Sequence, residues 1–318
     1  MRARDSLRRL GLGSMTVPQS SAKRFPDGAE FRIEVPSVES PRALAEVIAA
    51  AADFGIVVNR VSQGSGGMLL TEAELLEMSG LARATGMEVA LFIGPRAGFD
   101  TGVVSRSASG GAHFAAIRGL RQVEYAVEDI VRSAEAGIRG FLVADIGLLA
   151  ALVRLQRAGD LPAGIVWKMS AYSASTNAST LRVLQELGAG TVNIAADVTL
   201  TDLAEMRAHV DIPIDLYLET PDSMGGIVRG HEIADFIAVG APLYVKMGLR
   251  NAKGAYPAGE HIAGDVIAMA REKVRRSAIA LEWLNRLRPG SIQSKPGAAG
   301  LAIPVPPGTL WEIPQPTA

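Results

Sequence analysis

The chain has 318 residues, a hydrophobic content of 48% and a formal net charge of −1. A chain of this length can bury a large core, arranged as one large domain or as two ordinary ones. The balanced charge gives no support for a protein that binds nucleic acid or another polyanion. Because the sequence contains no cysteine, disulfides, thiolate nucleophiles, iron–sulfur clusters and cysteine-bound zinc are excluded.

Residues 1–30 form a mixed polar segment with a basic start and no periodicity, which we interpret as an N-terminal extension. They lack the apolar run of a signal peptide, and the sequence has no apolar run long enough to span a bilayer. We therefore expect a soluble, cytoplasmic protein with no membrane partner. The proline-rich residues 289–318 are interpreted as an extended C-terminal tail.

Between these segments, strand-like and helix-like stretches alternate eight times. In chain order, the pairs are 31–36 with 40–55, 56–62 with 71–86, 87–95 with 116–137, 140–145 with 146–159, 164–171 with 177–188, 190–197 with 199–210, 213–219 with 230–240, and 242–248 with 260–287. Such alternation indicates parallel βαβ units, and eight of them predict a (β/α)8 TIM barrel over residues 31–288. A doubly wound sheet is the alternative, but no Gly-x-Gly-x-x-Gly follows the first strand.

The stretch GIVWKMSA, residues 164–171, carries a lysine in the middle of a strand. Lysine is almost never fully buried unless it is paired. Since side chains alternate faces along a strand, apolar Ile165, Trp167 and Met169 share the face toward the helices. Lys168 is therefore predicted to point at the barrel axis.

The same alternation assigns polar side chains of other strands to the barrel interior. These side chains are Arg32, Glu34, Asn193, Asp197, Asp215, Tyr217, Glu219, Tyr244 and Lys246. The second strand has an ambiguous phase, and we take Val58, Arg60 and Ser62 as its inner set. Phe31, Leu216 and Val245 are predicted to face the helices.

Two interpretations of the inner charges are open. They could be an ion-pair network that only fills the barrel, but burying charges is costly and barrel interiors are normally filled by Val, Ile and Leu. Catalytic groups of this architecture lie at the C-terminal ends of the strands. We therefore predict catalytic roles for Lys168, Glu34, Glu219 and Lys246. Lys168 is expected to pair with Glu34 or Glu219.

Further polar residues near the strand ends are predicted to bind substrate. They are Arg60, Arg96, Asp145, Asn193, Arg229 and Arg250. The last two arginines follow the seventh and eighth strands, where this fold often holds phosphate, and arginine suits phosphate or carboxylate. The expected partner is thus a small anionic molecule, and the sequence leaves open whether the chain forms a homo-oligomer.

Two loops have alternative interpretations. Residues 62–67, SQGSGG, precede the capping-box pattern formed by Thr71 and Glu74. The loop either holds an anion on its backbone N–H groups or is an ordinary turn before a capped helix. Residues 105–111, SRSASGG, form a candidate lid.

No cofactor is expected from the motifs of the chain. The four histidines have no metal-ligand spacing. An all-oxygen set from Glu34, Asp145 and Glu219 would suit Mg²⁺ or Mn²⁺, but the neighbouring lysines compete with a metal as the counter-charge. We assign no metal ligands and leave a divalent metal open.

The segments VADIGLLAALVRL and KMSAYSASTNASTLRVLQELGAG, together with the chain up to about residue 230, resemble the collagenase-like peptidase family U-thirty-two. Asp145, Gly147 and Asn177 match positions of its motifs. The resemblance implies the barrel fold. Members carry cysteines after the seventh strand and an arginine where this chain has Ala196, so the resemblance describes a divergent, cysteine-free member and does not imply peptidase or hydroxylase activity here.

Three functions are compatible with these residues. The first is a lyase, aldolase or isomerase that acts on a carboxylated or phosphorylated metabolite through Lys/Glu acid–base or Schiff-base chemistry. The second is a hydrolase that uses carboxylates, with or without a divalent metal, as the family name suggests. The third is a non-catalytic barrel that kept a ligand pocket.

Overall fold

The computed structural model describes residues 2–13, 17–100, 102–173 and 175–309. Its centre is a closed barrel of eight parallel strands in sequential order. The strands are β1 (Phe31–Pro36), β2 (Arg60–Gln63), β3 (Glu88–Phe92), β4 (Gly140–Val143), β5 (Val166–Met169), β6 (Thr191–Asn193), β7 (Ile214–Glu219) and β8 (Leu243–Met247). The predicted (β/α)8 TIM barrel is therefore confirmed.

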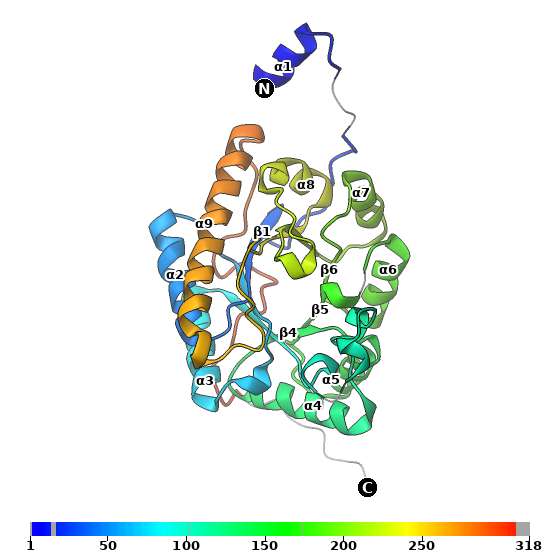
Figure 1. The fold of residues 1–318 in the computed structure, drawn as a ribbon, viewed down its shortest axis with the longest axis vertical. Coiled ribbons are helices and arrows are strands. Elements are labelled where there is room, and N and C mark those ends of the chain that lie inside the picture. The colour runs from blue at the N-terminus through cyan, green and yellow to red at the C-terminus, as the bar shows by residue number, and fades with distance from the viewer. Residues whose placement is uncertain (1, 14–16, 101, 174, 310–318) are drawn as a thin grey trace.

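A ring of helices surrounds the strands (Figure 1). The helices are α2 (Pro41–Phe54), α3 (Glu72–Thr85), α4 (Gly119–Glu135), α5 (Ile146–Ala158), α6 (Ala178–Leu187), α7 (Leu200–His209), α8 (Ile233–Gly240) and α9 (Ala263–Leu287). A further short helix, α1 (Arg2–Arg9), lies apart from the barrel in Figure 1. Within the described ranges, no helix combines the length and apolar character needed to cross a membrane.

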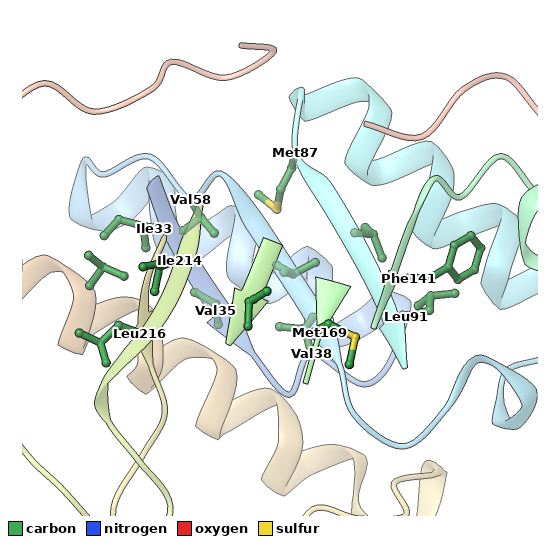
Figure 2. Close-up of a cluster of buried hydrophobic side chains, with 14 of the residues drawn as sticks. Ile33, Val35, Val38, Val58, Met87, Leu91, Phe141, Met169, Ile214 and Leu216 are labelled. Carbon is green, nitrogen blue, oxygen red and sulfur yellow. The ribbon is translucent and has the colours of Figure 1, made fainter. Parts of the chain in front are cut away.

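The apolar core lies between the strands and the helices, as the alternation predicts. Figure 2 shows Ile33 and Val35 of β1 and Leu216 of β7 within this cluster of buried side chains. The residues predicted to face the helices, Phe31, Trp167, Leu216 and Val245, all belong to it. The indole nitrogen of Trp167 donates to Gln156 on α5, 2.6 Å away, which fixes the phase of β5. The opposite face of that strand, which carries Lys168, is turned to the axis.

The loop before α3, residues 62–67, has two interpretations from the sequence, an anion-binding loop or an ordinary turn before a capped helix. The predicted capping box is present, with the Thr71 side chain accepting from the Glu74 backbone and Glu74 accepting from that of Thr71. Such a cap stabilises a helix by about 1 kcal/mol. The backbone N–H groups of Gly64 and Ser65 donate to the carboxylate of Glu39 at 2.9 and 2.8 Å. The anion held by this loop is therefore a side chain of the protein itself.

The segments that flank the barrel close its N-terminal end. Phe25 and Ala29 pack with Tyr244 inside the mouth of the barrel. Arg32 of β1 donates to the carbonyl oxygens of Ala299 at 2.6 Å and Gly300 at 3.1 Å. The C-terminal segment thus supplies acceptors for a buried guanidinium, and the open end of the barrel is the C-terminal one.

Candidate functional site

Glu34 lies at the centre of an ion-pair cluster inside the barrel. One carboxylate oxygen, Oε2, accepts from Arg60 Nε at 2.7 Å and from Lys168 Nζ. The other, Oε1, lies 3.0 Å from Lys246 Nζ and accepts from Ser62 Oγ at 2.7 Å. The predicted pairing of Lys168 with Glu34 is what the structure shows. Four side chains therefore converge on one fully buried carboxylate.

A second carboxylate, Asp215 of β7, completes the cluster. It pairs with Arg60 Nη2 through Oδ1 and lies 3.3 Å from Lys168 Nζ through Oδ2. Arg60 also lies 3.5 Å from Glu88 and stacks on the ring of Tyr244, 3.4 Å from its centroid. Since a buried charge is costly unless it is paired, these contacts explain how the barrel tolerates its charged interior.

The strand register brings these groups together. Glu34 pairs in register with Arg60 of β2 on one side and with Lys246 of β8 on the other. Inward side chains of adjacent strands at the same height are neighbours, so both cations reach the carboxylate directly. Lys168 belongs to β5, on the far side of the closed barrel from β1, and reaches Glu34 across the axis.

Burial and neighbouring charges set the protonation of the cluster. Burial alone would raise the pKa of Glu34, but Arg60, Lys168 and Lys246 hold the pKa of that carboxyl well below its ordinary value. Burial lowers the pKa of Lys168 to about 7, and the nearby Arg60 guanidinium acts in the same direction. Lys168 can therefore change charge near neutral pH while Glu34 stays ionised.

A cavity of about 380 Å³ opens above this cluster at the C-terminal ends of the strands. Its lining includes the side chains of Ser62, Asn193, Tyr217 and Lys246 from the barrel interior. Lys246 Nζ donates to Asn193 Oδ1 at 2.6 Å and lies 4.3 Å from the centroid of the Tyr217 ring. Lys246 and Ser62 both contact Glu34 and both line the cavity. They therefore connect the Glu34 cluster to the cavity.

The cavity carries more cationic than anionic side chains. Arg96, Lys246, Lys253 and Lys273 line it, with Asp222 as the carboxylate among its lining residues. Aromatic rings supply much of the remaining wall: Phe92, Phe99, Phe114, Tyr172, Tyr217 and Tyr256. A small anion with an apolar or planar body matches this composition.

The predicted site residues divide into three groups. Lys246, Asn193 and Arg96 line the cavity. Glu34, Lys168 and Arg60 lie in the cluster beside it and are not among the lining residues, with Lys168 only 1% exposed. The remaining four, Glu219, Asp145, Arg229 and Arg250, lie outside both the cluster and the lining.

The prediction that Glu219 joins the lysine cluster is wrong. The register between β7 and β8 shifts between Tyr217 and Glu219, so Glu219 lies level with Met247. Its Oε1 accepts from the backbone N–H of Arg250 at 3.0 Å, in the loop after β8. A bulge of this kind re-aims a side chain, and strand alternation alone does not reveal it. Asp215, four residues earlier, takes the position that we assigned to Glu219.

The cavity lining does not include Asp145, Arg229 or Arg250. Asp145 accepts from the backbone N–H of Leu148 at 2.8 Å and caps α5. Arg229 donates to Val198 O at 3.0 Å, and Arg250 is largely exposed. The three carboxylates that would form an oxygen-ligand metal site, Glu34, Asp145 and Glu219, therefore point to different partners. No group of three or more His, Asp or Glu side chains placed to hold a metal occurs among the residues with described coordinates.

Loops and α9 supply parts of the cavity wall that strand alternation does not predict. The candidate lid, residues 105–111, does not reach the lining, whereas Phe99 and Phe114 on either side of it do. Tyr256 and Lys273 were missed because they come from the loop after β8 and from α9, where no strand alternation applies. Lys273 donates to Pro36 O at 2.9 Å, and burial lowers its pKa to about 8.

Comparison with known proteins supports the resemblance seen in the sequence. Residues 116–219 match the model of peptidase family U32. Asp145 and Asn177, which match motif positions of the family, serve as N-caps of α5 and α6. A comparison with curated proteins gave no match.

Several solved structures are similar in fold. A U32 peptidase has 14% identity and a TM-score of 0.37, covering 64% of this chain and 74% of its own. A putative copper homeostasis protein CutC from Streptococcus agalactiae has 13% identity and a TM-score of 0.43, covering 68% and 97%. A putative lyase/mutase from Burkholderia cenocepacia has 15% identity and a TM-score of 0.43, covering 91% and 90%. Likenesses at this level do not identify an activity. Over residues 116–219, this cysteine-free chain resembles peptidase family U32.

Proposed function

We propose that the protein is a lyase, aldolase or isomerase that stabilises the enolate of a small anionic carbonyl compound in the cavity at the C-terminal end of the barrel. One observation carries the proposal. Lys246 lines the cavity and pairs with Glu34, which in turn pairs with a buried lysine of lowered pKa, Lys168. Perturbed titratable groups next to a cavity are typical of catalytic sites.

In the proposed reaction, Lys246 donates a hydrogen bond to the carbonyl oxygen of the substrate. Negative charge develops on that oxygen when a proton or a carbon fragment leaves the adjacent carbon. A positioned cation in a site shielded from water stabilises this charge strongly. Asn193 and Glu34 hold the ammonium group of Lys246 in place at 2.6 and 3.0 Å.

Lys168 acts as a positioning residue that adjusts the charge of the cluster. Both Arg60 and Lys246 lower its pKa, because like charges repel. The proton that leaves the substrate carbon passes to water in the cavity. If Lys246 transfers its own proton to the substrate oxygen, one positive charge leaves the cluster, and a neutral Lys168 then takes up a proton from water. The total charge around Glu34 then stays constant during the reaction.

Proton exchange tests this proposal without knowledge of the natural substrate. The methyl protons of pyruvate exchange with deuterium oxide when an enzyme stabilises its enolate or converts it to an imine, and ¹H NMR follows the loss of signal. We expect exchange above the buffer rate with the wild-type protein, and about a 100-fold loss in Lys246→Met. Arg182→Met is the matched control, since it removes an exposed cation that has its own partner, Glu186 at 3.1 Å, and does not line the cavity.

Two results would count against the proposal. One is the absence of exchange with pyruvate and also with 2-oxobutyrate and oxaloacetate. The other is an unchanged rate in Lys246→Met. Borohydride treatment then separates two chemical routes, because a mass increase on Lys246 in the presence of pyruvate indicates an imine, whereas exchange without a trapped adduct indicates electrostatic stabilisation of the enolate.

A further inference from the structure

Arg96 is a buried cation whose hydrogen-bonding capacity is only partly used. It follows β3, it is 2% exposed, and it lines the cavity. Its Nη2 donates to the backbone oxygen of Ser65, and its Nε has no hydrogen-bond partner among the described residues. Burial lowers the pKa of Arg96 to about 10, and it lowers the pKa of the buried Arg207 to about the same value, so the unused donor and not the pKa separates the two arginines.

A second buried arginine shows how this chain satisfies a guanidinium that serves structure alone. Arg207 is 3% exposed. It donates to four backbone carbonyl oxygens, those of Gly240, Val210, Ile212 and Pro242, at 3.0 to 3.2 Å. It lies on α7 and is not among the lining residues of the cavity. The unused donor of Arg96, by contrast, belongs to a side chain that borders open space.

Aromatic rings fix the orientation of Arg96. Its guanidinium carbon lies 4.0 Å from the centroid of the Phe92 ring and 4.5 Å from that of Phe99. Rings against a guanidinium leave the N–H groups at its edge for hydrogen bonding in the plane. The planar guanidinium group of Arg96 is therefore held in place before any ligand binds. This reduces the entropy lost on binding an oxyanion.

We propose that Arg96 is a second anion subsite of the cavity, which takes the terminal oxyanion of an elongated substrate while the reacting end of that substrate lies at Lys246. This inference rests on the proposed function only for the assignment of the reacting end. Phe92, Leu142 and Phe114 also line the cavity and pack together in one apolar cluster. The substrate class is accordingly a small molecule with an anion at each end and an apolar segment between them.

Three probes of equal chain length test the subsite: hexanoate, adipate and 5-phosphonopentanoate. They differ only in the terminal group, which is a methyl, a carboxylate or a phosphonate, and none has a carbonyl that could react. Isothermal titration calorimetry with the full-length protein measures each affinity. A charge-assisted bond in a buried site predicts that a terminal anion raises affinity by about 10- to 100-fold. The larger of the two gains identifies carboxylate or phosphate as the preferred oxyanion.

Variants show whether Arg96 is responsible. Arg96→Met keeps an unbranched apolar stem near the rings and should remove the gain, so that all three probes bind like hexanoate. Arg96→Lys keeps the positive charge without the planar guanidinium group and should retain part of the gain in affinity. Arg182→Met removes an exposed cation on α6 that does not line the cavity, and it should leave the gain within about twofold of wild type.

The inference is overturned if the three probes bind the wild-type protein equally, if neither anionic probe binds at millimolar concentration, or if Arg96→Met keeps the gain. If Arg96→Met fails to fold, Arg96→Lys still tests the role of Arg96, because its gain in affinity should be smaller than that of the wild-type protein. Because the probes do not react, their binding is independent of the pyruvate exchange test. A gain in affinity without pyruvate exchange would refute the proposed reaction and retain the subsite.

Discussion

The ammonium group of Lys168 on β5 reaches across the barrel axis and pairs with the carboxylate of Glu34 on β1. Glu34 also pairs with Arg60 and Lys246, so its removal leaves three buried cations short of a partner. Removal of Lys168 leaves Glu34 with two cations. We therefore expect Glu34→Gln to lower the free energy of unfolding by about 3–5 kcal/mol, and Lys168→Met by less than about 2 kcal/mol.

Urea denaturation followed by circular dichroism at pH 7 measures both changes. Lys168→Met should still lower the rate of pyruvate exchange, because the cluster loses the group that adjusts its charge. Equal destabilisation by the two substitutions would mean that Glu34 is not the centre of the cluster. A Lys168→Met protein with wild-type exchange would assign Lys168 a structural role only.

The lowered pKa of Lys168 predicts how stability depends on pH. Its pKa is about 7 in the folded protein and 10.5 as the ordinary value, so the unfolded chain binds more protons between these two pH values. The free energy of unfolding should therefore rise with pH above about 7, by up to about 1.4 kcal/mol per pH unit from this one group. Below pH 7 both states hold the proton, and this contribution becomes constant.

Denaturation at intervals from pH 6 to pH 9.5 checks this dependence. Lys168→Met should have a smaller slope between pH 7 and 9.5 than the wild-type protein. Lys273, whose pKa is lowered to about 8 by burial, contributes in the same direction at higher pH. The Lys273→Met variant should accordingly keep the rise between pH 7 and 8, and identical slopes in all three proteins would show that Lys168 is protonated throughout.

The part of the site that lies on regular strands was predictable from the sequence. Alternation within a strand has a fixed period of two, so the inward positions of Glu34, Lys168 and Lys246 follow from their apolar neighbours. Even the ambiguous second strand has the phase that we chose, since Arg60 and Ser62 both contact Glu34. Closure of the barrel then brings inward residues of distant strands into contact.

The ends of strands and the loops were not predictable in this way. Asp197 was expected inside the barrel, but β6 ends at Asn193 and Asp197 is exposed. Glu219 lies beyond a register shift, and no residue type marks that shift in the sequence. Tyr256 reaches the cavity from the loop after β8, whose path depends on tertiary packing. The anion bound by residues 62–67 is Glu39, a contact that local sequence does not encode.

Asp215 lies inside the barrel, as strand alternation predicts, and its contacts there indicate a role in setting the charge of Lys168. Its carboxylate lies 3.3 Å from Lys168 Nζ and is one of the groups that raise the pKa of that lysine against the effect of burial. Asp215→Asn keeps the shape and removes the charge, so the pKa of Lys168 should fall below 7. The ¹³Cε resonance of labelled lysine, assigned by its loss in Lys168→Met, would report this shift in a pH titration. An unchanged titration would show that Asp215 does not act on Lys168.

The C-terminal segment is expected to be required for stability. Arg32 is 1% exposed and donates to Ala299 O, Gly300 O and the hydroxyl of Ser294. Deletion of residues 294–318 removes these acceptors and leaves a buried guanidinium short of partners, which should cost about 3 kcal/mol or more. Deletion of residues 310–318 removes none of these contacts and serves as the control. Similar melting temperatures for both truncated proteins would refute the role of the segment.

Glu219 provides a test of where the site ends. Its carboxylate accepts from the backbone N–H of Arg250 at 3.0 Å and lies 3.9 Å from Arg276 on α9, outside the cluster around Glu34. Glu219→Gln keeps an acceptor for that N–H group, so pyruvate exchange should stay within about threefold of wild type, because a weak pair with a half-exposed arginine contributes about 1 kcal/mol at most. Asp215→Asn, four residues away on the same strand, should lower the rate by at least about tenfold, because it removes a charge that contacts both Arg60 and Lys168. Measured side by side at pH 7, the two variants distinguish the observed site from the one expected from strand alternation. If Glu219→Gln had a lower rate of pyruvate exchange than Asp215→Asn, the reacting groups would lie at the end of β7. The cluster around Glu34 would then have only a structural role inside the barrel.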